Sequence, residues 1–228
     1  MFGFAELTGN KVLNLVQFFY EIYHLSSEAL IELFKWNRKG NNVTFNLLLR
    51  QILFTGIDAV PMISLISLLL GTIVIIQSTT QLPIIGGESF VGSVIVLVII
   101  RELGPLITAI VVIGRSGSAI ATELGLMSIN REIEALEVMG ISKTRILVLP
   151  RLLGCIIATI CLTIYFDLVA ILGGYIISRI QLTTPFNLYM HKIISSLEFS
   201  DISISISKST IFGIIIAILS SYHGLRVK

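Results

Sequence analysis

Four ionisable side chains interrupt one long apolar stretch, residues 91–127, and these are the residues best placed to do chemistry. They are Arg101, Glu102, Arg115 and Glu123. A charged group at the depth of bilayer hydrocarbon costs about 2.5 to 3.5 kcal/mol on insertion scales, so such groups normally face a protein interior or a wet cavity. On an unbroken helix with Arg101 at 0°, Arg115 falls at about 320°, Glu123 at about 40° and Glu102 at about 100°. The four side chains would then share one side of the helix.

Two roles are open for this polar side. In one, it is the wall of a central cavity, where Arg101 and Glu102 are available to the head group of a bound lipid. In the other, the charges form buried ion pairs that hold helices together. We favour the cavity for Arg101 and Glu102, and the ion pairs for Arg115 and Glu123.

Small residues recur every fourth position along the same stretch, in two adjacent rows. This spacing lets helices approach closely, so it predicts tight helix packing or a dimer seam. One row is Gly114, Ser118 and Thr122, and the other is Gly117, Ala121 and Gly125.

The run Gly114-Arg115-Ser116-Gly117 also matches the G-x-S-G pattern of an intramembrane serine protease. A serine nucleophile needs a base within hydrogen-bonding reach. The histidines are not predicted at the depth of Ser116, so the hydrolase is a weak alternative. They are His24, His191 and His223.

A second alternative is an ion- or proton-coupled carrier that uses Glu102, Glu123 and Asp167 as relays, although the absence of an obvious inverted repeat weakens it. No His or Cys cluster has metal-ligand spacing, and no G-x-x-x-x-G-K-[ST] phosphate loop is present. Cys155 and Cys161 point in different directions on a helix and have no expected redox role. We therefore predict a chain that is not an enzyme and binds no metal or cofactor itself.

The polar segment after the apolar stretch predicts a short helix at about residues 131–139. Asn130 is the expected N-cap, acidic residues at Glu132 and Glu134 suit the first turn, and Gly140 is the expected stop. Apolar residues on this helix would form a ridge that either enters a groove on a soluble partner or lies against the membrane surface or the chain's own bundle. The ridge consists of Ile133, Leu136 and Met139, with Val138 beside them.

The elements that position these residues are membrane helices. The chain has 54% hydrophobic and 13% charged residues and a mean hydropathy of +0.93, far from the composition of a soluble domain. We expect an all-α polytopic bundle in a membrane domain at 51–228, preceded by an amphipathic region at 1–50 that lies at the interface or docks on the bundle. The last crossing also alternates like a strand. The four expected crossings are 52–80, 91–127, 146–179 and 202–223.

The distribution of basic residues predicts the orientation. Lys and Arg concentrate in the N-terminal region, in the 128–151 loop and at the C-terminal end, whereas the 81–90 turn has none. The positive-inside rule places both termini in the cytoplasm. The net charge of +2 is too small to suggest nucleic acid as a partner, and the start of the chain does not resemble a removable signal peptide.

The run RELGPLITAIVVIGRSGSAIATELGLM, followed by REIEALEVMGI, closely resembles the signature of the MlaE-type permeases. These are the membrane subunits of lipid ABC transporters that work with MCE-domain proteins, and they include a plastid branch. The resemblance is dense over 101–141 and extends over 45–225. Members of the family usually continue past the segment that matches SYHGLRVK into one further membrane helix, so we expect this chain to be short at its C-terminus.

The resemblance implies a homodimeric permease in the bacterial inner membrane, with phospholipid in a cavity at the dimer interface. It also implies two copies of a cytoplasmic ATPase, which would use the ATP, and an MCE-domain protein on the outer side. Arg101 and Glu102 would lie near the cavity, and Val74 and Gln77 would line its wall. The segment from Glu132 to Met139 would be the coupling helix that meets the ATPase.

Overall fold

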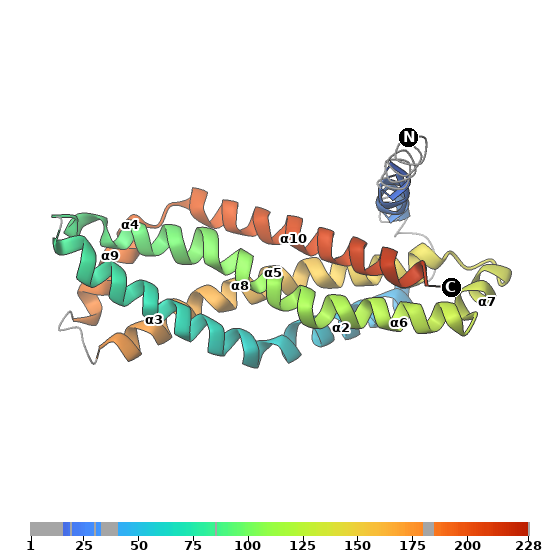
Figure 1. The fold of residues 1–228 in the computed structure, drawn as a ribbon, viewed down its shortest axis with the longest axis horizontal. Coiled ribbons are helices and arrows are strands. Elements are labelled where there is room, and N and C mark those ends of the chain that lie inside the picture. The colour runs from blue at the N-terminus through green and yellow to red at the C-terminus, as the bar shows by residue number, and fades with distance from the viewer. Residues whose placement is uncertain are drawn as a thin grey trace, which may run out of the picture.

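The computed structural model describes residues 16–18, 20–29, 31–32, 41–84, 86–179 and 185–227 of the chain. All regular structure within these residues is helical, and it forms one elongated bundle (Figure 1). Four helical stretches are long and apolar enough to cross a membrane: Phe45–Ile84, Val91–Ile129, Thr144–Ile176 and Phe199–Leu225. The predicted all-α polytopic fold is confirmed.

The first stretch consists of α2 (Asn41–Gly56), a short 3₁₀ turn (Ile57–Ala59) and α3 (Val60–Ile84). The third consists of a π-helical turn (Thr144–Val148) and α8 (Leu149–Ser178).

The fourth stretch, α10 (Phe199–Leu225), is one helix, so the strand-like alternation of its first residues does not produce a strand. A capping box formed by Glu198 and Asp201 begins it.

The second stretch changes helix type along its length. It runs through α4 (Val91–Ile95), a π segment at Val96–Leu103, α5 (Gly104–Val112), a second π segment at Ile113–Gly117 and α6 (Ser118–Ile129). A π turn holds an extra residue and therefore rotates whatever follows it. The single polar side expected from an unbroken helix is consequently wrong.

Helix α8 lies at the centre of the bundle and packs against α2, α3, α5 and α10. Glycines bring it close to α3: a Cβ placed on Gly174 would lie 2.7 Å from the carbonyl carbon of Gly71, and one on Gly71 would collide with the Ala170 carbonyl oxygen. Short α9 (Phe186–Ser196) packs against α4 at the end of the bundle opposite α7 (Figure 1).

The expected short helix is α7 (Glu132–Val138), and Gly140 follows it with φ +72° as anticipated. Asn130 is not its N-cap. Asn130 instead ends α6, and Arg131 occupies the cap position in the left-handed conformation with φ 59°. The turn between α6 and α7 is too tight for an extended cap residue, so the Asn130 side chain donates to Glu132 Oε1 at 3.3 Å.

Helical residues between 16 and 32 lie at the α7 end of the bundle and project from its side (Figure 1). They contact the bundle through one face. The Tyr222 hydroxyl donates to Glu21 Oε2 at 2.8 Å, and the Thr144 hydroxyl donates to Glu28 Oε2 at 3.2 Å. These contacts favour the docked arrangement of the N-terminal region. Four basic residues of this region, on which the predicted orientation partly depends, lie outside the described part of the chain: Lys11, Lys35, Arg38 and Lys39.

Candidate functional site

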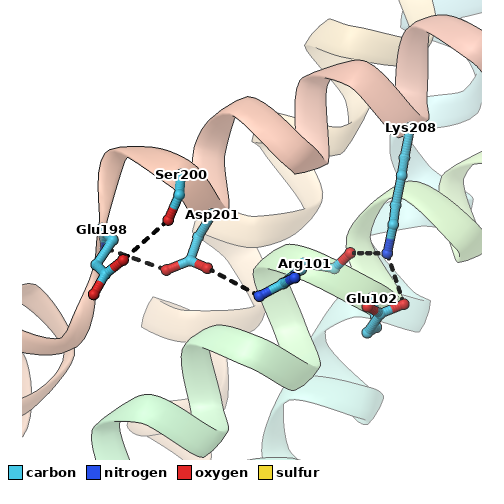
Figure 2. A network of polar contacts seen from close by, with 6 residues as sticks. All are labelled: Arg101, Glu102, Glu198, Ser200, Asp201 and Lys208. Carbon is cyan, nitrogen blue, oxygen red and sulfur yellow. Dashed lines mark hydrogen bonds and ion pairs between the residues drawn. The ribbon is translucent and has the colours of Figure 1, made fainter.

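Arg101 and Glu102 lie on the first π segment and face α10, where they meet two charged residues (Figure 2). Lys208 Nζ lies 2.8 Å from Glu102 Oε2 and donates to the Arg101 carbonyl oxygen at 2.9 Å. Arg101 Nη1 lies 3.7 Å from Asp201 Oδ1. We call these four residues the charged face.

The beginning of α10 holds Asp201 in place. Its Oδ2 accepts the Glu198 backbone N–H at 3.2 Å, while the Ser200 hydroxyl donates to Glu198 Oε2 at 3.1 Å (Figure 2). The carboxylate is thus shared between capping the helix and attracting Arg101. Any movement of the first turn of α10 would change the distance between these two charges.

The described residues leave most of the charged face uncovered. The side chains of Arg101, Glu102 and Lys208 are 40%, 55% and 33% exposed, although they belong to stretches that cross the membrane. Charges at this depth are too costly to leave against lipid tails. Water, a polar ligand or another polypeptide must therefore meet them.

Val74 and Gln77 lie apart from this network, on α3. Val74 packs against the apolar core and Gln77 is exposed. Among the described residues, neither one belongs to the set of contacts that joins Arg101, Glu102, Asp201 and Lys208. Within one chain the structure does not bring these two residues to the charged face.

Arg115 ties the second stretch to the first. Its Nη2 lies 2.7 Å from Asp58 Oδ2, its Nη1 donates to the Phe54 carbonyl oxygen at 2.9 Å, and its guanidinium lies 5.3 Å from the centre of the Phe54 ring. Glu123 pairs instead with α8, at 2.9 Å from Arg151 Nη2. Both residues thus form ion pairs between helices.

These two ion pairs are less buried than expected. Arg151 is 8% exposed, but its partner Glu123 is 63% exposed and Asp58 is 55% exposed. The carboxylates sit at the surface of the bundle, where they keep part of their hydration.

The two rows of small residues have different neighbours. Gly117 packs against the last stretch, because a Cβ on it would lie 3.0 Å from Ser220 Oγ, and Gly125 packs against Val227 just beyond that stretch, where a Cβ would lie 3.3 Å from a methyl group. Ala121 of the same row meets Gly224, whose Cβ would lie 2.8 Å from the Ala121 carbonyl oxygen.

The other row is uncovered. A Cβ on Gly114 would meet nothing within 4 Å, and Ser118 and Thr122 are exposed. Their hydroxyls donate to carbonyl oxygens of their own helix, at 2.8 Å and 2.9 Å. The hydroxyls of this row thus have hydrogen-bond acceptors within their own helix, and the row has room for a neighbouring helix.

The ridge expected on α7 is divided between two directions. Ile133 is buried and Leu136 is half-buried against the bundle, whereas Val138 and Met139 are 89% and 64% exposed. Glu132 is exposed beside them. Ile133 and Leu136 thus follow the alternative in which the ridge lies on its own bundle, while Val138 and Met139 point away from it.

The structure does not assemble a serine nucleophile. Ser116 is fully buried, its hydroxyl has no hydrogen-bond partner within the described residues, and all three histidines are exposed on other elements. The carrier relay is also dispersed. Glu102 pairs with Lys208, Glu123 pairs with Arg151, and Asp167 packs alone against Gly104. Within the same described residues, no three His, Cys, Asp or Glu side chains gather as metal ligands.

Sequence reasoning missed four partners: Asp58, Arg151, Asp201 and Lys208. Two of them had a visible signal, because Lys208 is the one charge in the expected last crossing and Asp58 is the one charge in the expected first crossing. The pairing could not be read without knowing which helices are neighbours.

Four membrane-length helical stretches among the described residues, two of which carry paired charges, define a multi-pass membrane protein. The family model described as Permease MlaE matches residues 48–228. The chain therefore belongs to the MlaE permease family.

Individual relatives agree with this assignment. A probable ABC transporter permease protein of Rickettsia typhi is 32% identical over 179 residues, which cover 78% of this chain and 69% of the relative. The intermembrane phospholipid transport system permease protein MlaE of Haemophilus influenzae is 32% identical over 133 residues, covering 58% and 51%. The chloroplastic protein TRIGALACTOSYLDIACYLGLYCEROL 1 of Arabidopsis thaliana is 32% identical over 177 residues, covering 78% and 51%.

Proposed function

We propose that this chain is the membrane subunit of an ABC transporter that moves phospholipid. The observation that carries the proposal is the charged face, which exposes Arg101, Glu102 and Lys208 at membrane depth. A zwitterionic or anionic head group supplies the complementary charges that such a face requires. The name of the Haemophilus influenzae relative supports phospholipid as the cargo.

A second copy of the chain would cover the exposed face. Gly114, Ser118 and Thr122 form an uncovered small-residue row on the same stretch as Arg101 and Glu102, so a neighbouring helix could approach closely there. A homodimer of this kind would enclose a lipid cavity between its subunits. Val74 and Gln77 would join its wall only in the dimer.

Energy would come from a separate ATPase, which would use the ATP, and an MCE-domain protein would receive or deliver lipid on the outer side. The permease names of the relatives support the ATPase partner. Val138 and Met139 are the apolar residues that α7 exposes, and they fit a groove on a soluble protein. The chain would lie in the inner membrane of a bacterium. Because its basic ends would face the inside of the cell, α7 and the N-terminus would be cytoplasmic.

ATP-dependent transfer of a fluorescent phospholipid between reconstituted vesicles tests this function. The chain would be assembled with its ATPase and MCE-domain protein, and the double variant V138D/M139D would be compared with the matched surface variant E134Q. The double variant should lose ATPase binding and transfer together, while E134Q retains both. Transfer that persists at the wild-type rate without the ATPase would overturn the proposal.

A further inference from the structure

A cavity of about 560 Å³ lies at the α7 end of the bundle, well away from the charged face. Its walls come from the beginnings of the first and third stretches, the end of the second, and α7 itself. This volume is in the range of about 300 to 1,000 Å³ that is usual for small-ligand sites.

The lining is amphipathic. Phe54, Met127 and Ile146 supply apolar surface, while Arg50 and Arg151 supply positive charge. Glu123 also lines the cavity, but Arg151 already neutralises it, at 2.9 Å. The site therefore has one net positive charge beside an apolar wall.

Both arginines have unused hydrogen-bonding capacity. Arg50 is exposed and has no hydrogen-bond or ion-pair partner among residues that the structure describes. The Arg151 side chain is 8% exposed, and its Nε has no hydrogen-bond partner among the described residues even though Nη1 and Nη2 are both engaged. A buried guanidinium N–H without an acceptor is costly, so this arginine is well suited to bind an added oxyanion.

We propose that this cavity binds an anionic phospholipid of the adjacent leaflet, with its phosphate at Arg50 and Arg151 and part of an acyl chain against Met127 and Ile146. Charge complementarity and the apolar wall together favour an amphiphile over a soluble anion. The cavity also lies where three of the membrane-length stretches begin or end, so a lipid of the adjacent leaflet could enter it from the side. The proposed orientation makes this the cytoplasmic leaflet. Lipid binding in the cavity does not itself depend on the proposed transport function.

Leu136 gives the cavity a link to α7. It is the α7 residue that lines the cavity, and its neighbours Val138 and Met139 are the exposed pair on the same helix. A bound lipid would therefore press on the inner side of the helix whose outer side is proposed to meet the ATPase. The lipid would act as a structural ligand that fixes the position of α7.

Photo-crosslinking tests the site. The purified full chain would be placed in nanodiscs with phosphatidylglycerol or phosphatidylcholine that carries a diazirine on one acyl chain, and labelled peptides would be identified by mass spectrometry. Phosphatidylglycerol should label the peptides containing Met127 and Ile146 more strongly than phosphatidylcholine does. R50Q should lower this labelling by about tenfold, the loss expected when one charge-assisted hydrogen bond is removed.

The matched control is R131Q, which removes an exposed arginine at the same end of the bundle but outside the cavity. It should leave labelling unchanged, and M127W, which fills the cavity, should abolish it. Equal labelling by the two lipids, or no effect of R50Q, would overturn the proposal, as would displacement of the lipid by inorganic phosphate alone. Loss of labelling in R50Q but not in R131Q would support the site, and because the assay uses the purified chain without its partners, a failure of the proposed transport function would not change this result.

Discussion

Replacing Lys208 with methionine should weaken the packing of α10 against the second stretch, because it removes two polar contacts and keeps most of the side-chain volume. Lys208 Nζ contacts Glu102 Oε2 at 2.8 Å and the Arg101 carbonyl oxygen at 2.9 Å. Both charged side chains are partly exposed, at 33% and 55%, so the ion pair alone should contribute only about 0.2 to 1 kcal/mol. With the carbonyl contact, K208M should lower the free energy of unfolding by about 1 to 2 kcal/mol.

A double-mutant cycle makes this prediction specific. K208M, E102Q and the combined variant would be unfolded by denaturant in the same detergent, with K192M as the control for removing a lysine outside the charged face. The coupling energy should be about 0.5 to 1 kcal/mol in the chain alone, and larger when a partner subunit excludes water from the pair. Strictly additive effects in both the isolated chain and the assembled transporter would refute the contact and its role.

Three further predictions concern other parts of the chain. E123A should destabilise the bundle by about 1 to 3 kcal/mol in denaturant unfolding, because buried Arg151 loses its carboxylate. G71V should prevent normal assembly of the bundle, seen as aggregation in size-exclusion chromatography, because its Cβ has no room beside α8. Hydrogen bonds donated by Tyr222 and a neighbouring glutamine lower the pKa of Glu21, so this carboxylate stabilises the docked N-terminal helix at neutral pH, and the contribution is lost as pH falls through that lowered pKa. The protection factors of residues 20–29, which are exchange rates corrected for the intrinsic pH dependence of amide exchange, should therefore fall in acid, and less so in Y222F.

Controls for these predictions come from the same structure. E123Q keeps a hydrogen-bond acceptor for Arg151 and should cost less than E123A. G114A should assemble normally, because Gly114 has nothing within 4 Å of its added methyl group. Two results would contradict the packing described here. One is that G71V and G114A behave alike, and the other is that the protection factors of residues 20–29 do not change with pH.

The fold was predictable because bilayer thickness sets how long an apolar run must be, and four runs of that length stand out. Which charges meet was not predictable. The π segments rotate Arg101 and Arg115 toward different neighbours, and no periodicity in the residues reveals a π turn in advance. Lys208 and Glu102 are 106 positions apart, so only the packing of α10 against the second stretch brings them together.

The short helix shows a second limit of local reasoning. Gly140 ends it as the residue type suggests, but the beginning depends on how tightly α6 must turn, and Arg131 takes the cap position in place of Asn130. The direction of the apolar ridge follows from that turn. Val138 and Met139, and not Leu136, are consequently the large apolar residues exposed at this end of the bundle.

The central claim is that the charged face meets lipid head groups. The most direct measurement is crosslinking by a phospholipid that carries a photoreactive head group, in vesicles that contain the assembled transporter. We expect labelled peptides containing Arg101, Glu102 or Lys208, with a yield that changes when ATP is added. Labelling confined to the outer surface of the bundle, with these peptides unmodified in every nucleotide state, would contradict it.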